Sequence, residues 1–175
     1  MKRIFSVGVT ATLVAASVAA LQAAPRTTES TFATRTSTLM QDMAARSSAL
    51  EQAADKLHAL SVQQENPDVS GQLYAIRENV NQIGRDLRIL QSEKEALPAA
   101  DRQAIARVRP MMPVIAADTS EAIQNYNTHR DDLWAIPFSA EANKIYREAA
   151  RVDRDLHLAL ARDKELRLES KLSTD

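Results

Sequence analysis

The chain contains no cysteine, only three glycines and few aromatic residues among its 175 positions. Without cysteine it cannot form disulfides, thiolate metal sites or covalently attached haem, so its stability must come from packing. The β-branched and aromatic residues that favour strands are scarce, and no glycine-rich phosphate loop is present. The abundant alanine, leucine, arginine, glutamate and glutamine favour helices instead, and we expect an all-α fold.

The charged residues are nearly balanced, with 22 lysines and arginines against 23 aspartates and glutamates, which gives a formal net charge of −1. Nucleic-acid-binding domains usually carry a clear excess of positive charge. We therefore expect no nucleic-acid partner.

The first 24 residues have the pattern of a secretory signal peptide. Lys2 and Arg3 are followed by an apolar stretch over residues 4–21 and by small residues just before Pro25. These are the charged, apolar and cleavage regions of a signal, so we predict removal of residues 1–24 and export to the periplasm or the extracellular space. A transmembrane anchor is the alternative, but the strongly apolar part is short and rich in alanine and threonine. We expect no stable membrane span after cleavage.

A stripe of apolar residues in the middle of the chain alternates strictly at intervals of four and three, with only Lys94 breaking it. This spacing is that of a long helix that packs along one face, as in a coiled coil. Such a helix is not stable alone, so partner helices must cover the stripe. Its members are Val69, Leu73, Ile76, Val80, Ile83, Leu87, Leu90 and Leu97.

The rest of the chain shows similar apolar periodicity, and we expect a single helical domain over residues 25–175. The predicted helices cover about residues 31–62, 67–96, 101–135 and 139–172. Because the connections are short, an antiparallel up-down-up-down four-helix bundle of long helices is the expected architecture. An extended helical hairpin that dimerises would bury the same apolar stripes between two chains, so a homo-oligomer is an alternative. The expected seam of the last helix is Ala142, Ile145, Ala149, Val152, Leu156, Ala159 and Leu166.

Two prolines interrupt the third predicted helix. Pro110 and Pro113 each lack the amide donor of a helical hydrogen bond and push against the carbonyl four residues earlier. We therefore expect the third helix to be kinked at Pro110 and Pro113, with a full break as the alternative.

The three histidines are the only side chains suited to both metal binding and proton transfer near neutral pH. His58, His129 and His157 each have a carboxylate within one turn, but none lies in a His-x-x-x-His or Glu-x-x-His arrangement. In an antiparallel bundle His58, His129 and Asp132 would lie at one end and could ligate a metal. Weak surface contacts are the commoner role of such pairs.

Met43 on the first predicted helix and His157 on the last are expected at comparable heights on neighbouring helices. This layout resembles the soluble b-type cytochromes with a four-helix bundle, which are likewise small, exported and free of cysteine. The resemblance implies noncovalent haem held by a methionine and a histidine. In that family the two ligands lie near the helix ends, whereas Met43 and His157 lie well inside. The usual role of a methionine in an apolar stripe is to fill the core.

Two further groups of residues are candidates for partner binding. Met111 and Met112 lie between the two prolines and could form an adaptable apolar patch, although packing around a kink is the more frequent role. Five arginines could concentrate positive charge at one end and bind an anionic lipid or glycan, although nearby acidic residues favour a solvated face. These arginines are Arg85, Arg88, Arg102, Arg107 and Arg109.

No catalytic, nucleotide-binding or metal-binding motif of useful specificity is present, and we assign no catalytic, cofactor-binding or metal-binding residue. The pattern favours an exported, noncatalytic helical protein of the bacterial cell envelope that acts by binding another protein. It would serve as a chaperone-like module, a scaffold or an accessory subunit. The alternative is a four-helix bundle that binds haem or a metal through its histidines.

Overall fold

The computed structural model describes residues 25–64, 68–130, 132–135 and 137–173, and within these ranges it contains helices and no strand. The all-α prediction is therefore confirmed. The predicted signal peptide, residues 1–24, lies outside the described residues. The α-helices are α1 (Pro25–Gln63), α2 (Val69–Ser92), α3 (Ala99–Val108), α4 (Met111–Thr128) and α5 (Phe138–Leu172), and the short 3-10 helices are η1 (Lys94–Ala96) and η2 (Leu133–Ala135).

Helix α2 buries seven of the eight residues of the predicted apolar stripe, and the eighth, Leu97, follows η1 and is 3% exposed. The inward residues of α2 are at most 6% exposed, which confirms the spacing argument made from the sequence. The helix begins at Val69, with Asp68 at its N-cap position and without a side-chain capping hydrogen bond. The buried residues are Val69, Leu73, Ile76, Val80, Ile83, Leu87 and Leu90.

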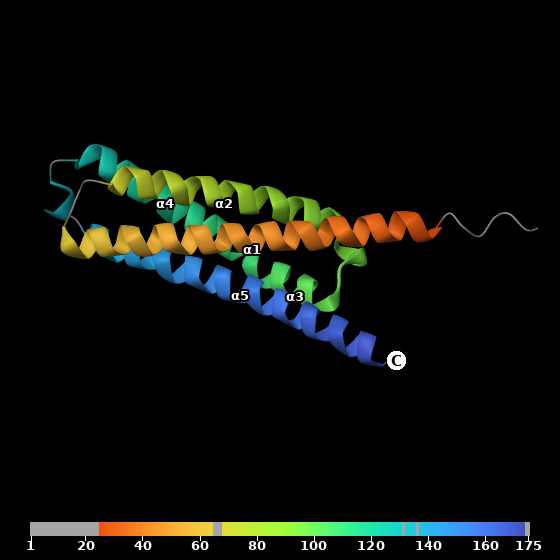
Figure 1. Cartoon of the computed structure of the whole chain (residues 1–175). Helices are drawn as coiled ribbons and strands as arrows, with labels where there is room; N and C mark the ends of the chain where they lie inside the picture. The colour runs from red at the N-terminus through yellow and green to blue at the C-terminus, as the bar shows by residue number, and fades with distance from the viewer. Residues whose placement is uncertain (1–24, 65–67, 131, 136, 174–175) are drawn as a thin grey trace, which may run out of the picture.

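Each of the long helices α1, α2, α4 and α5 packs against two of the other three (Figure 1). Helix α1 lies between α2 and α5, and α4 contacts both α2 and α5. The short helix α3 packs mainly against α5. The apolar faces of these helices meet in one core, to which Met43, Leu57, Ile115 and Ile145 contribute side chains with no exposed surface.

The third predicted helical segment is divided into α3 and α4. Arg109 and Pro110 separate the two helices, and both keep right-handed helical dihedral angles, with φ of −51° and −71°. The Arg109 amide still donates to the Ile105 carbonyl at 2.9 Å. Pro110 and Pro113 cannot donate to the carbonyls four residues earlier, so the hydrogen-bond ladder is interrupted here. Pro113 lies in the first turn of α4, where the missing donor removes no bond within that helix.

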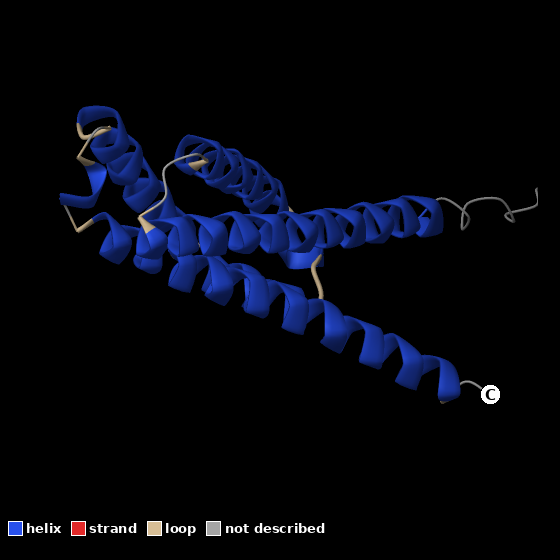
Figure 2. Cartoon of the chain, turned by 60° about the vertical axis from the view of Figure 1, so that its left-hand side comes forward, coloured by secondary structure: helices blue, strands red, loops and turns tan. Residues whose placement is uncertain are grey.

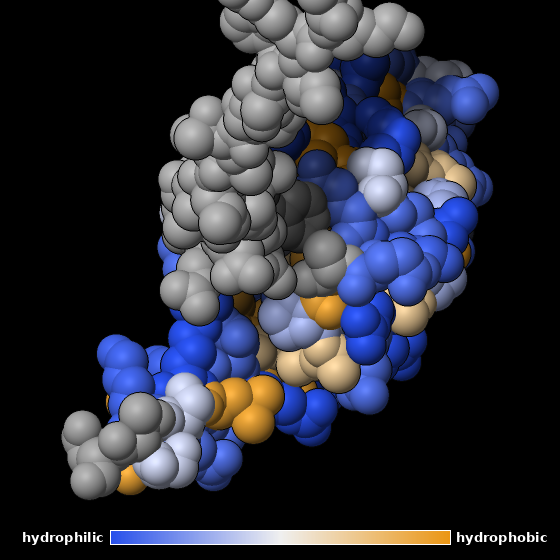
Figure 3. Space-filling model, turned by 90° about the vertical axis from the view of Figure 1, so that its right-hand side faces the viewer, coloured by the Kyte–Doolittle hydropathy of each residue, from blue (hydrophilic) through white to orange (hydrophobic). Residues whose placement is uncertain are grey.

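The C-terminal part of α5 differs from its predicted seam. Residues from Ala142 to Ala159 on that seam are buried, but Leu166 is 57% exposed. The prediction for Leu166 was wrong. Helix α5 diverges from α1 toward its C-terminal end (Figure 2), and the described helices leave this side chain exposed. Seen from that end, apolar patches interrupt a mainly hydrophilic surface near the end of α5 (Figure 3).

Candidate functional site

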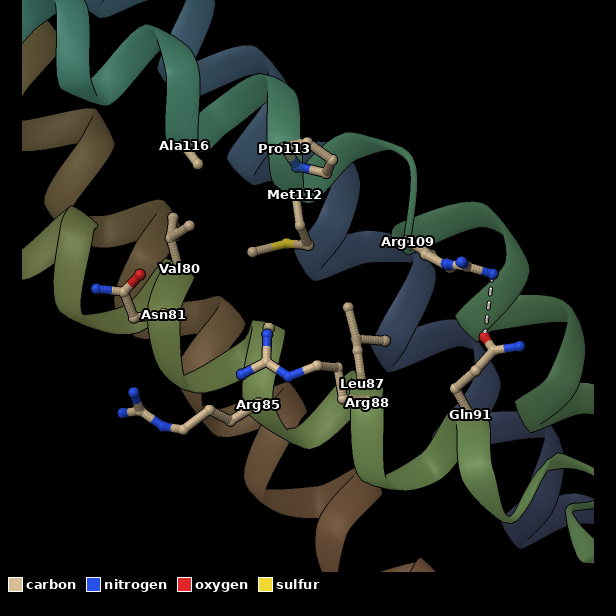
Figure 4. A pocket seen from close by; sticks show the side chains of 11 residues that line it. Val80, Asn81, Arg85, Leu87, Arg88, Gln91, Arg109, Met112, Pro113 and Ala116 are labelled. Atoms are coloured by element: carbon tan, nitrogen blue, oxygen red, sulfur yellow. Dashed lines mark hydrogen bonds between the residues drawn. The ribbon is translucent and has the colours of Figure 1, made fainter.

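A hollow in the described part of the surface lies between α2 and the junction of α3 with α4. It has a volume of about 440 Å³ and is open to solvent. In Figure 4 the side chains of Leu87 and Met112 point toward one another between the helices, as do those of Val80 and Ala116. We call this hollow the basic groove. It is lined by Val80, Asn81, Gly84, Arg85, Leu87, Arg88, Gln91, Arg109, Met112, Pro113 and Ala116.

Small residues keep the basic groove open. Gly84 has no side chain, and a Cβ atom added there would meet no atom within 4 Å. Ala116 lines the opposite side from α4. The apolar floor comes from Val80, Leu87 and Met112, which are at most 6% exposed as whole residues and also belong to the core. The groove is therefore a shallow opening into the contact between α2 and α4.

The rim of the basic groove is positively charged. Arg109 donates from Nη1 to the Gln91 Oε1 at 3.4 Å, so its partner is a neutral amide. Within the described chain Arg88 makes no hydrogen bond or ion pair, whereas Arg85 lies 3.6 Å from Glu78. Among the described residues no carboxylate lines the groove. Arg88 and Arg109 therefore favour an anionic ligand, because arginines without an acidic partner attract carboxylates and phosphates.

A second hollow of about 260 Å³ continues the basic groove along α3. It shares Gln91 and Arg109 with the first hollow and adds Lys94 and Arg102 to the rim, although Lys94 lies 3.7 Å from Glu95. Arg102 donates to the Leu97 carbonyl at 2.9 Å and has no acidic partner among the described residues. The lining of this hollow also contains no carboxylate.

The structure therefore brings together most of the arginines and one of the methionines that the sequence marks as binding candidates. Arg85, Arg88 and Arg109 share the groove with Met112. Arg107 is separate, since its Nε lies 3.3 Å from Asp155 of α5.

A polar cluster joins α1 to α5 away from the basic groove. Asp153 accepts hydrogen bonds from the hydroxyls of Ser47 and Ser48, at 3.0 and 2.7 Å. The Ser48 Oγ lies 2.9 Å from the His157 Nε2, and Asp153 lies 3.3 Å from the same nitrogen. A catalytic triad places its carboxylate on the other ring nitrogen, Nδ1. The cluster therefore lacks the geometry of an activated serine.

Glu51 lies beside this polar cluster. Burial raises the pKa of the Glu51 carboxyl, and the neighbouring charge of Asp153 raises it further. The carboxyl also shares a hydrogen bond with Asp153. A nearby carboxylate disfavours the charged form of Glu51, which is the usual effect of a like charge at close range.

The candidate metal ligands do not meet. His129 Nδ1 lies 3.3 Å from Asp132 Oδ1, as the sequence spacing suggests. The ring of His58 instead stacks on Tyr146 of α5, with the ring centroids 6.0 Å apart. Among the described residues no group of three or more histidine, cysteine or acidic side chains could hold a metal ion.

The pair suggested by the cytochrome resemblance occupies two different environments. Met43 has no exposed surface and is part of the core. The His157 side chain is 51% exposed and is occupied by Ser48 and Asp153.

Sequence reasoning missed Asn81, Gly84 and Gln91 in the basic groove, and Ser47, Ser48 and Glu51 beside His157. The spacing of the groove residues on α2 could have identified them from the sequence. Asn81, Gly84, Arg88 and Gln91 repeat at intervals of three and four, which places them on one face. The serines carry no comparable pattern.

Searches of protein-family models, curated proteins and solved structures gave no match for this chain. Across the described ranges, no helix is both long and apolar enough to cross a membrane.

Proposed function

We propose that this chain is a noncatalytic helical protein of the bacterial cell envelope that binds an acidic protein partner in the basic groove. The observation that carries the proposal is the lining of the two joined hollows, in which five cations and no carboxylate surround an apolar floor. The protein would act on this partner as a chaperone-like module, a scaffold or an accessory subunit.

The groove suits a protein ligand for two reasons. Arginine is enriched at protein interfaces, because its planar guanidinium can hold a carboxylate through two hydrogen bonds. The small part of Val80, Leu87 and Met112 that stays exposed gives the groove an apolar floor, which a partner can desolvate. Arg88 and Arg109 provide charge that no acidic group of the described residues neutralises.

Export is part of this proposal and rests on the signal-peptide pattern of residues 1–24. Cell fractionation should place the protein in the periplasm or the medium, and N-terminal sequencing of the recovered protein should begin close to Pro25. Recovery of the intact N-terminus from the cytoplasm would contradict export.

We also infer an antiparallel up-down-up-down bundle in which the third helical segment is kinked at Pro110 and Pro113. The contacts of α1 with α2 and α5, and of α4 with the same two helices, support this arrangement. The helical dihedral angles of Arg109 and Pro110 support a kink rather than a full break.

Partner binding can be tested by photo-cross-linking in cells of the source bacterium. A photoreactive amino acid replaces Asn81, which is exposed and lines the basic groove. We expect an adduct whose partner peptide is rich in aspartate and glutamate. The double variant Arg88→Glu and Arg109→Glu should lower the adduct yield at least about tenfold, since it reverses the charge of the rim.

The matched control is Arg147→Glu with Arg154→Glu, which makes the same change of charge on exposed positions of α5. This control should leave the adduct unchanged. An equal loss in both double variants would mean that net charge, rather than the basic groove, attracts the partner. No adduct from position 81 would overturn the proposal.

A further inference from the structure

The contact between α2 and α4 is hollowed beyond the basic groove. A third hollow of about 180 Å³ lies at the other end of the same helix pair, where α2 begins and α4 ends. Tyr74 and Arg77 line it from α2, and Ile123 and Tyr126 line it from α4. Tyr74 is 69% exposed, although tyrosine offers a large apolar surface. The helix pair therefore has openings at both ends.

One face of α2 runs through all three hollows. Its residues follow one another at alternating intervals of three and four, which is the repeat of a surface that packs against another helix. These residues are Tyr74, Arg77, Asn81, Gly84, Arg88 and Gln91. The buried stripe of α2 has the same repeat but lies on a different face. We call the surface between this second face and α4 the α2–α4 seam.

We propose that an acidic, amphipathic α-helix of the partner lies along the whole α2–α4 seam. This inference rests on the proposed function and adds the form of the ligand. The acidic side chains of the partner helix face Arg88 and Arg109, and one of its apolar side chains contacts Tyr74 and Ile123. The partner helix therefore contacts the arginines at one end of the seam and the apolar residues at the other end at the same time.

A helix fits the seam better than an extended peptide does. Extended peptides usually bind by adding a strand to the edge of a sheet, where unpaired backbone groups are available. Both sides of the seam are helices, whose central backbone groups are already paired within α2 and α4. A partner helix also satisfies its own backbone, so it needs only side-chain contacts.

Charge complementarity selects the acidic partner. Most of the cations lie toward the α3 end of the seam, with Arg88, Arg109 and Arg102 free of acidic partners in the described chain, whereas Arg77 lies at the other end. The other end offers aromatic and apolar surface at Tyr74, Ile123 and Tyr126. This division predicts a partner helix that is acidic at one end and apolar at the other.

The spacing of two cross-links distinguishes a helical ligand from an extended one. Tyr74 and Gln91 are about 17 residues, and therefore about 26 Å, apart along α2. A photoreactive amino acid is placed at each position in turn in the full chain, and the adducts are mapped by mass spectrometry. We expect both adducts within one acidic segment of one partner, about 17 residues apart if it is helical.

An extended partner would cover the same length in about eight residues. That spacing would overturn the helical inference and leave the proposed acidic partner in place. Adducts at Gln91 but none at Tyr74 would also overturn it, because only the basic groove would then be occupied. Adducts at neither position would overturn the helical inference, and the absence of an adduct from position 81 as well would overturn both proposals.

An anionic membrane surface could also bind the arginines of the basic groove, so a second experiment tests binding to lipid vesicles. The purified full chain is mixed with vesicles of phosphatidylglycerol, and sedimentation is measured for the native protein and for Arg88→Glu with Arg109→Glu. We expect no sedimentation that depends on these two arginines. Vesicle binding lost in this variant and kept in Arg147→Glu with Arg154→Glu would assign the basic groove to anionic lipid and overturn the inference.

Discussion

Ser48 of α1 and His157 of α5 meet across the helix contact, with 2.9 Å between the Ser48 Oγ and the His157 Nε2. Asp153 lies within hydrogen-bond or ion-pair distance of both side chains. These contacts join the first and last long helices through polar groups at the edge of the core. Glu51 lies beside these contacts, and its raised pKa makes the contact between α1 and α5 sensitive to pH.

Glu51→Gln should flatten part of the pH dependence of stability. Burial and the charge of Asp153 raise the pKa of Glu51 above its ordinary value of 4.5. The folded protein thus holds this proton to a higher pH than the unfolded chain does. The resulting stability is present at low pH and is lost as the pH rises through the raised pKa.

Urea unfolding between about pH 4 and pH 7 measures this effect. Relative to the native protein, Glu51→Gln should gain stability as the pH rises. The exposed Glu165 provides the control, since Glu165→Gln should follow the native pH profile. Parallel profiles for the native protein and Glu51→Gln would contradict the prediction.

Asp101→Asn should stabilise the protein at neutral pH. Asp101 is 5% exposed, and its Oδ1 has no hydrogen-bond partner in the described structure. Burial, followed by the charge of Asp163, raises the pKa of Asp101 from 3.8 to about 6, although Arg167 lowers it. The protonated carboxyl therefore stabilises the fold at low pH, and this stability is lost as the pH rises from about 4 to about 6.

At pH 7 we expect Asp101→Asn to be more stable by about 2 kcal/mol, because the native protein must bury a charged carboxylate. The gain is limited because the N-terminal turn of α3 stabilises part of this charge. At about pH 4 the difference should nearly vanish. Denaturant unfolding at the two pH values provides the measurement, with the exposed Asp42→Asn as control. A gain of equal size at both pH values would assign it to packing instead of ionisation.

The periodicity of α2 is sufficient to predict which of its residues are buried. Val69, Ile76 and Ile83 recur at intervals of seven and lie on one face of any helix that contains them. Burying that face is the main source of stability available to a chain without disulfides. The same argument fails for Leu166, because periodicity does not say where the neighbouring helix diverges.

The basic groove is harder to predict, since its charge depends on which face each arginine occupies after packing. Arg107 and Arg109 are close in sequence but point to different neighbours, Asp155 of α5 and Gln91 of α2. The sequence contains both arginines without indicating this division. Gly84 also has no apolar signal, and its importance lies in the space that it leaves.

Ile83→Asp should abolish cooperative unfolding. Ile83 has no exposed surface, so the aspartate would place an unpaired charge in the core at a cost comparable with the stability of a whole domain. Thermal melting followed by circular dichroism is the measurement. Asn81→Asp adds the same charge to the exposed face of α2 and should melt cooperatively. A cooperative melt of Ile83→Asp would show that the packing of α2 is wrong.

Gly84→Ala should stabilise the protein by about 1 kcal/mol, because alanine has a higher helix propensity than glycine. The new Cβ meets no atom within 4 Å, so no strain opposes the gain. At Gly71 a Cβ would contact the Asp68 carboxylate, and Gly71→Ala should therefore gain less. Denaturant unfolding of the two variants makes the comparison. A larger gain at Gly71 would contradict the packing described around these glycines.

Gly84→Leu should separate partner binding from stability. The leucine side chain would occupy the opening of the basic groove, where Gly84 leaves space, and leucine is a good helix former. We expect stability to stay within about 1 kcal/mol of the native protein. The yield of the cross-linked adduct from position 81 should fall at least about tenfold, corresponding to about 1.4 kcal/mol of binding free energy. Gly84→Ala adds only a methyl group and should keep most of the adduct. Undiminished cross-linking in a folded Gly84→Leu protein would show that the partner does not enter the groove between α2 and α4.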